Sequence, residues 1–545
     1  MRKINNLKNK SGELKITFKN IISDTIENST SHGIPKMAYN MHIGLKIMWA
    51  FFLLASTASC VYFIIIGFIS YYQYNTYISS SEIQEIPSKF PAISICNSKF
   101  INKVAATDYI NSSSEIQSNL ASMVPWTTNL TEYGQYFWKG FFETYILQAT
   151  VSRDSNLTTT QKSFLGFQLS DMLLVCRYNW VTCSASDFSL VLDPLYGNCY
   201  TYNSGKDANG TTVNIQNMSV PGANYGLSIE LFTGDPALQS KYEYKGDGFV
   251  VFVHNQSNPS LLNSKSILVP TGTETNLKIK KTFTSRLSSP YGNCLLDVSA
   301  TSIFSSTSFD YIVRVLNIAY TQEYCYSICL ESKIVDACGC NSWYSPSYGN
   351  QSLCGYTDNC WKLINYLVTR NNLTVINDCV SQCPLECNSV DYGISTSSLK
   401  FPNRYYRTLL AQTSAIKNAN ISLSDINDSV LRLNIFYETL TYTNNQETAS
   451  IDAFTIMSNF GGTLGLFLGV SFLSFVELFE LIYRILHAII ENKLQRNGFN
   501  QMDSKIELCS LSSEVNTTNG TSKSSVFNAP SFPYLIEETK FELPN

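Results

Sequence analysis

The chain has 545 residues, of which 15% are charged and 13% are aromatic. The charged fraction lies well below the roughly 25% of ordinary soluble proteins, and the abundant aromatics argue against a large disordered protein. A net charge of -4 provides no basic surface, so we expect no nucleic-acid partner.

The first feature in chain order that indicates a class is an uncharged apolar run from Ile47 to Tyr72. As a helix it would extend roughly 39 Å, enough to cross about 30 Å of hydrocarbon. Trp49 at one end and Tyr71 at the other suit the two interfaces of a membrane. We therefore predict a transmembrane helix over 47–72.

The segment between this run and the next is rich in cysteine. Fourteen of the 16 cysteines lie there, an even number that favours a disulfide framework in an oxidising compartment. Nine of them fall between Cys325 and Cys387. A zinc site is the rival interpretation, but the sequence has no histidine between His254 and His487. Ten Asn-x-Ser/Thr sequons in the same segment are consistent with a glycoprotein.

The pattern of apolar residues in this segment predicts a mixed α and β domain. Strands are expected where β-branched and aromatic residues alternate with polar ones. These are Gly226–Phe232, Phe249–Val253, Leu277–Phe283 and Val430–Tyr437. Helices are expected over Ile318–Lys333 and Trp361–Thr369.

A second apolar run covers Phe460–Ile482 and differs from a plain membrane anchor. Small residues recur at helical spacing, which permits close helix approach. They are Gly461, Gly465 and Gly469. A polar stripe of Ser471, Ser474 and Glu477 is offset from them, and Glu480 follows. Acids facing lipid would be costly, so we expect the helix to line a polar pathway. A tightly packed dimer whose acids reach the interface is the alternative.

Positive charges place both ends of the chain on the same side of the membrane. The first 46 residues contain eight Lys/Arg against three acids, and Arg484, Lys493 and Arg496 follow the second run. The positive-inside rule therefore puts both termini in the cytoplasm. The predicted organisation is a cytoplasmic N-terminus over 1–46, the first span over 47–72, an extracellular Cys-rich domain over 73–450, a pre-pore segment and second span over 451–483, and a cytoplasmic tail over 484–545.

Motifs for catalysis are missing from the sequence. There are four histidines in all, and the chain has no H-E-x-x-H, no G-x-S-x-G and no Walker-type glycine loop. We therefore expect neither an enzyme nor a resident metal or cofactor.

Several short motifs stand in a fixed order along the chain. They are Ser31-His32-Gly33, Phe90-Pro91-Ala92-Ile93-Ser94-Ile95-Cys96-Asn97, Gly197-Asn198-Cys199-Tyr200-Thr201-Tyr202-Asn203, Pro290-Tyr291-Gly292-Asn293-Cys294, Tyr320-Thr321 with Cys325 and Cys329, Cys338-Gly339-Cys340, and Cys383-Pro384 with Cys387, Tyr392 and Phe401-Pro402. In this order they resemble the degenerin/epithelial sodium channel superfamily, most closely its acid-sensing and peptide-gated branches. The resemblance covers about residues 30–485.

The resemblance implies a membrane protein with two transmembrane helices per subunit and a large disulfide-rich α+β extracellular domain. Three such subunits, identical or related, would surround a sodium-selective, amiloride-sensitive pore in the plasma membrane, in contact with lipid. The cysteine pairs it implies are Cys96–Cys199, Cys176–Cys183, Cys294–Cys387, Cys325–Cys383, Cys329–Cys379, Cys338–Cys360 and Cys340–Cys354.

The resemblance also implies roles for residues around the pore. Gly469-Val470-Ser471 stands at the selectivity filter, with valine where the family has alanine or serine. Ser458 occupies the gate, or degenerin, position, and His32-Gly33 the inner pore motif. The remaining pore-lining candidates are Gly465, Ser474, Glu477 and Glu480. The permeant ion would be Na⁺.

Protons are not the expected stimulus. Acid-sensing relatives have histidines just after the first span and crowded acids after a cysteine equivalent to Cys360. This chain has Asn75 and Thr76 in the first place and Lys362 and Tyr366 in the second. An extracellular ligand, most plausibly a short peptide bound between about Asn203 and Ser285, is the favoured stimulus. Acid gating and constitutive opening are the alternatives.

Three other classes compete with this interpretation. An ATP-gated trimeric channel would share the topology, but it would need lysines placed for phosphates. A two-span scavenger or adhesion receptor would not need the glycine and serine stripes of the second run. An ectoenzyme would need catalytic motifs.

Overall fold

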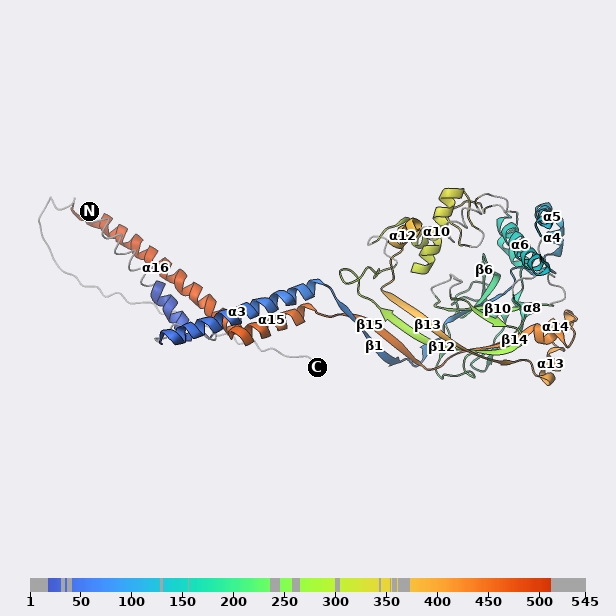
Figure 1. Cartoon of the computed structure of the whole chain (residues 1–545), viewed down its shortest axis with the longest axis horizontal. Helices are drawn as coiled ribbons and strands as arrows, with labels where there is room; N and C mark the ends of the chain where they lie inside the picture. Colours follow the sequence, from blue (N-terminus) through green and yellow to red (C-terminus); the bar gives the residue numbers. More distant parts are fainter. Residues whose placement is uncertain are drawn as a thin grey trace, which may run out of the picture. The chain divides into compact units, whose positions relative to one another are not determined.

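The computed structural model describes residues 18–30, 35–36, 42–127, 131–154, 156–235, 246–256, 265–298, 304–342, 345–352, 354, 360 and 373–510. The chain forms two compact units. The terminal unit combines Met1–Ile69 with Ala453–Asn545, and the central unit is Ser70–Asp452. Figure 1 shows the elements of both, coloured along the sequence.

The central unit is mixed α and β. Its strands are β1 Thr76–Gln84, β2 Ser88–Lys89, β3 Ala92–Asn97, β4 Leu173–Tyr178, β5 Val181–Thr182, β6 Phe188–Asp193, β7 Gly197–Tyr202, β8 Asn217–Met218, β9 Leu227–Phe232, β10 Gly248–His254, β11 Ile267–Pro270, β12 Thr273–Ser285, β13 Asn388–Lys400, β14 Val430–Tyr437 and β15 Thr441–Ala449. Its helices are α4 Thr107–Ser112, α5 Ser114–Thr127, α6 Glu132–Arg153, α7 Thr159–Leu165, α8 Leu169–Met172, α9 Thr307–Asp310, α10 Gln322–Cys338, α12 Leu373–Gln382, α13 Arg404–Leu410 and α14 Ser414–Asn418. Short helical turns are η1 Ala185–Asp187, η4 Tyr311–Val315 and η5 Asp425–Asp428.

The larger sheet is organised around β12. Its strand order is β1-β15-β12-β14-β9-β4-β5, and β13 pairs with β12 along the full length of both strands. On its other side β12 pairs in parallel first with β14 and then with β15. The smaller sheet has the order β11-β10-β3-β7-β6.

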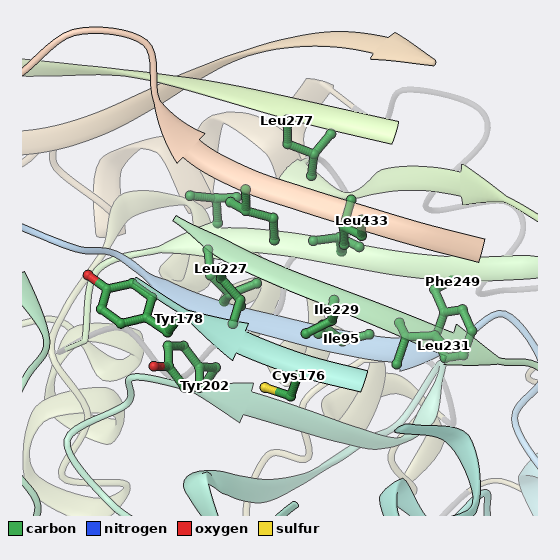
Figure 2. Packing of buried hydrophobic residues seen from close by; sticks show 14 of the residues in the cluster. Ile95, Cys176, Tyr178, Tyr202, Leu227, Ile229, Leu231, Phe249, Leu277 and Leu433 are labelled. Atoms are coloured by element: carbon green, nitrogen blue, oxygen red, sulfur yellow. The ribbon is translucent and has the colours of Figure 1, made fainter. Parts of the chain in front are cut away.

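The main hydrophobic core lies between the two sheets. Figure 2 shows side chains of the smaller sheet, such as Ile95 and Phe249, directed toward those of the larger sheet, such as Ile229 and Leu433. β14 is buried on both faces, as expected for a strand inside a covered sheet. Each fully buried aliphatic side chain contributes about 1.5–3 kcal/mol.

All four predicted strands are present, with small differences at their ends. Val430–Tyr437 is found unchanged as β14, and Gly226–Phe232 begins one residue later, as β9. The other two predicted strands are extended, as β10 and as the longer β12. The predicted helix Ile318–Lys333 begins later, as α10, because Thr321 caps it by accepting a hydrogen bond from the Tyr324 amide. The predicted helix Trp361–Thr369 lies outside the described residues.

Two helices crosslinked by disulfides explain the regular cysteine spacing. Cys325 and Cys329 lie one turn apart on α10. Cys325 joins Cys383, just beyond the end of α12, and Cys329 joins Cys379, in the last turn of α12. Both links have a Cα–Cα separation of 5.7 Å. The cysteine spacing of 379, 383 and 387 therefore continues past the helix, which ends before Pro384.

All fourteen cysteines of the central unit are in disulfides. The pairs are Cys96–Cys199, Cys176–Cys183, Cys294–Cys387, Cys325–Cys383, Cys329–Cys379, Cys338–Cys360 and Cys340–Cys354. These are the pairs that the family resemblance implies. They leave no thiol of this set for zinc, and the described residues contain no cluster of three or more potential metal ligands.

An ion-pair network fastens α13 to the larger sheet. The guanidinium of Arg432 on β14 donates to Glu230 on β9 at 2.6 and 2.9 Å and to Glu274 on β12 at 3.3 Å. The Tyr406 hydroxyl of α13 donates to the same Glu230 carboxylate at 2.9 Å. The Glu230 side chain is only 5% exposed, so loss of these partners would leave a buried acceptor unpaired.

We expect Arg432→Leu to lower the free energy of unfolding by about 2–3 kcal/mol, because it leaves a buried carboxylate without its cation. The measurement is the melting temperature of the detergent-solubilised full chain. Lys417→Leu, which removes a cation from an exposed position on α14, is the matched control. Equal melting temperatures for the two variants would contradict the prediction.

Glu331 on α10 is a second buried acid, and no lysine or arginine among the described residues forms an ion pair with it. Its carboxylate accepts hydrogen bonds from the amide and the hydroxyl of Ser342, the latter at 2.6 Å. Burial raises the pKa of Glu331, and these hydrogen bonds offset only part of that effect. The folded chain therefore holds the Glu331 proton more tightly than the unfolded chain does.

This shift predicts a pH dependence of stability. A carboxyl with a raised pKa stabilises the folded chain most below its ordinary pKa, and that contribution is lost as the pH rises through the raised value. Glutamine does not titrate, so only the parent loses this contribution. As the pH is raised from about 5 to about 7.5, we therefore expect the melting temperature of Glu331→Gln to increase relative to that of the parent chain. Glu323→Gln, an exposed position on the same helix, serves as the control. A pH-independent difference would refute the assignment.

Candidate ion pathway

The terminal unit contains the apolar helices. These are α3 Ile43–Tyr72, which continues to the start of the central unit, α15 Ala453–Leu468 and α16 Phe472–Ser510, and residues 18–27 are also helical. Among the described residues, α3 alone is long and apolar enough to cross a membrane by itself. α15 and the first part of α16 meet the same test only as a pair, bent by 75°.

The bend falls on the predicted filter motif, Gly469-Val470-Ser471. Gly469 has φ +65°, a left-handed conformation that glycine adopts without the steric cost a side chain brings. The Gly469 amide donates to the Gly465 carbonyl at 3.0 Å, and the Val470 amide donates to the Leu464 carbonyl at 3.3 Å. This is the geometry of a helix terminus, and it ends α15.

The expectation of one continuous second helix is therefore wrong. Gly461 and Gly465 lie on α15, but Gly469 lies outside it, so the glycine stripe does not continue to the third position. Ser471 precedes α16 and caps it. Its carbonyl accepts from the Ser474 amide at 3.0 Å, and its own amide donates to the Ser474 hydroxyl at 3.1 Å.

At the bend, three backbone carbonyls accept no hydrogen bond from the part of the chain that the structure describes. No described residue donates a hydrogen bond to the carbonyl of Leu468, Gly469 or Val470. In hydrocarbon each such group would cost several kcal/mol, so irregular backbone at membrane depth is found where it lines water or is buried in protein. Carbonyl oxygens at such a place can replace part of the hydration shell of an ion.

α3 packs against α15 beside the bend. The Ser56 hydroxyl donates to the Phe467 carbonyl at 2.5 Å. The rings of Phe63 and Phe467 stack with centroids 5.6 Å apart. A Cβ added at Gly67 would lie 3.3 Å from the Phe460 ring. Ser56 could not be recognised from the sequence, because a single serine in an apolar run has no distinguishing pattern.

Beyond the bend, the acids of α16 contact the segment that precedes α3. The Thr30 amide donates to Glu477 at 3.2 Å, and the hydroxyls of Thr30 and Ser474 lie 2.9 Å apart. The Arg484 guanidinium donates to Glu480 at 2.5 Å and to Asp24 of the 18–27 helix at 2.8 Å. The Glu480–Arg484 spacing could have been read from the sequence, but the contact with Asp24 could not.

Among the remaining predicted positions, the structure describes Ser458 but not the inner pore motif. Ser458 lies on α15 and is exposed. His32 and Gly33 lie outside the described residues, as do Lys362 and Tyr366.

A disulfide-rich domain inserted between apolar helices, one of them interrupted at Gly469-Val470-Ser471, is the arrangement expected of a membrane protein of the channel class. The sequence model described as "Amiloride-sensitive sodium channel" matches residues 25–481. The chain therefore belongs to the amiloride-sensitive sodium channel family, within the degenerin/epithelial sodium channel superfamily. This is a family of ion channels and not of enzymes.

Individual relatives are distant. Epithelial sodium channel subunit alpha of Cavia porcellus is 28% identical over 326 residues, which cover 58% of this chain and 44% of that protein. Subunit gamma-2 of Xenopus laevis is 26% identical over 339 residues, 60% of this chain and 48% of that protein. The chain thus matches slightly less than half of the length of these relatives. A solved proton-activated chloride channel aligns over 82% of this chain and 97% of its own, at a TM-score of 0.28 and 7% identity, too low to support an argument.

The bend leads to a prediction about Gly469. Alanine there would hold φ +65° at a cost of about 1–2 kcal/mol, or would extend α15 and close the bend. We expect Gly469→Ala to abolish the sodium current or to change its reversal potential, at unchanged surface biotinylation. Gly462→Ala is the control, because an added Cβ meets nothing within 4 Å there. Full, selective current from Gly469→Ala would show that the bend is not needed.

Proposed function

We propose that this chain is a pore-forming subunit of an amiloride-sensitive sodium channel that admits Na⁺ passively across the plasma membrane. Membership of the family supports the proposal. The observation that carries it is the interruption of the second apolar segment at Gly469-Val470-Ser471, where no described residue donates a hydrogen bond to the carbonyl of Gly469 or Val470.

The proposed topology has two spans. α3 forms the first, and α15 with the start of α16 forms the second, so both termini are cytoplasmic and the central unit is extracellular. The charge distribution, the disulfides and the bent pair support this arrangement. Three subunits, identical or related, would place three copies of the bend around one axis. The names of the relatives, which are subunits, support assembly with related chains.

Within this pore, Gly469, Val470 and Ser471 form the narrowest part and Gly465 lies just outside it. Ser474, Glu477 and Glu480 line the wider inner part, and His32-Gly33 contributes to the inner entrance. Ser458, on the outer helix, occupies the gate. A small, exposed side chain at position 458 is consistent with close approach of three copies.

The proposed stimulus is an extracellular ligand, most plausibly a short peptide. The sequence lacks the histidines and the crowded acids of acid-sensing relatives. A cavity in the central unit, lined among others by His254, Lys265 and Tyr392, offers space for such a ligand. Acid gating and constitutive opening are the alternatives within the same function, and a two-span receptor is the alternative outside it.

The decisive experiment is to express the chain alone and record current under voltage clamp. Steps from about pH 7.4 to about pH 5, a panel of short amidated peptides, and ATP are applied in turn, each with and without amiloride. An amiloride-blocked sodium current supports the proposal, and the effective stimulus chooses among the gating alternatives. A chain that reaches the surface alone and with related subunits, yet passes no current, would favour the receptor.

Ser471→Trp tests the filter assignment. A bulky side chain at the entrance of α16 would obstruct the narrowest part, so we expect loss of current or reduced preference for Na⁺ over K⁺. Phe475→Trp, an exposed aromatic position one turn into α16, is the control. An unchanged conductance and reversal potential in Ser471→Trp would remove the filter from this position.

A further inference from the structure

About one third of the way along α16 there is a cation that the proposed pore does not account for. Arg484 stands four residues after Glu480, so both side chains project from the same face of the helix. If Glu480 faces the ion path, Arg484 faces it one turn further on. A free guanidinium there would repel permeating cations.

Arg484 is not free in the structure. One of its terminal nitrogens donates to Glu480 at 2.5 Å and the other to Asp24 at 2.8 Å. Asp24 is itself oriented, because the Asn28 amide donates to its other carboxylate oxygen at 3.0 Å. The guanidinium is therefore divided between two carboxylates from segments more than 400 residues apart in sequence.

The side chains of this network, together with Glu477, surround one small cavity. Its lining includes Asp24, Asn28, Glu477, Glu480 and Arg484. Three carboxylates and one guanidinium give this group a net charge of -2 per subunit. Without Asp24 the group would have a net charge of -1, and one arm of the guanidinium would be released.

We infer that Asp24 is a conductance-determining residue: it neutralises Arg484 and positions it, so that the inner part of the pathway stays attractive to cations. The inference depends on the proposed function. Each of the two ion pairs is solvent-exposed and weak as a source of stability. The Asp24 charge acts instead by raising the local concentration of cations, an effect that pathway walls of low dielectric constant amplify.

The test is single-channel recording of the full chain in inside-out patches, with cytoplasmic Na⁺ at about 150 mM and at about 15 mM. We expect Asp24→Asn to lower outward sodium conductance about two- to fivefold at low salt, and less at high salt, because salt screens the exposed charge. Arg484→Gln should raise conductance. Asp24→Asn added to Arg484→Gln should have a much smaller effect than Asp24→Asn alone.

Glu27→Gln is the matched control, since it removes the same charge from the same helix at a side chain that contacts Ser23 instead. Equal effects of Asp24→Asn and Glu27→Gln would overturn the inference. An unchanged conductance in Arg484→Gln would also overturn it. The same holds if Asp24→Asn lowers conductance equally in the parent chain and in Arg484→Gln.

A chemical cross-link tests the contact without current. Asp24→Cys and Arg484→Cys are combined in a chain whose Cys60 and Cys509 are serine, with a protease site inserted at the exposed turn of Gly210. No disulfide spans that point, because Cys96–Cys199 lies before it and the next pair begins at Cys294. After cleavage, a bifunctional thiol reagent should hold the two fragments together.

Ile22→Cys in place of Asp24→Cys lies on the opposite side of the 18–27 helix and should give little product. Equal cross-linking by both pairs would overturn the contact. A cross-link specific to residue 24 in a chain that passes no current would count against the proposed function, whereas normal currents without the cross-link would count against this inference.

Discussion

The larger sheet depends on the pairing of one strand with three others. β12 is hydrogen-bonded to β13 along its whole length, and on its opposite edge to β14 and then to β15. The strands β9, β4 and β5 reach the sheet through β14, and β1 reaches it through β15. Leu277 and Ile279 of β12 lie in the main core with side chains of β14, β9 and β4, so a displaced β12 would disturb both the pairing of the larger sheet and this core.

How far the sequence predicts the fold depends on how local the determinants are. β14 could be recognised because its apolar and β-branched residues are contiguous, and α10 because Thr321 caps it and the cysteines repeat along one face. The helices α5 and α6 were not predicted. Their apolar residues have only a weak helical periodicity. The available signal was Thr131, which caps α6, but a single threonine is too common to indicate a helix start by itself. The mostly exposed strand β1 and the half-buried strand β15 were missed because both are rich in polar residues and therefore resemble loops in the sequence.

In the candidate site, too, local features could be predicted and long-range ones could not. Composition was enough to find the second apolar segment, but a hydropathy pattern cannot distinguish a straight helix from one broken in three residues. Only Gly469, whose φ is positive, could have indicated the bend, and glycine is common in membrane helices. Contacts such as that between Asp24 and Arg484 join residues at opposite ends of the chain, so no window of sequence contains them.

α16 has a length that a membrane span does not require. It runs for 39 residues, roughly 58 Å, which is about twice the thickness of the hydrocarbon layer. Arg484 lies one third of the way along it. A hydrocarbon layer that contains the bend can therefore cover only the first part of α16. The rest of the helix, toward Ser510, extends beyond that layer, so its surface must suit water or a partner and not lipid.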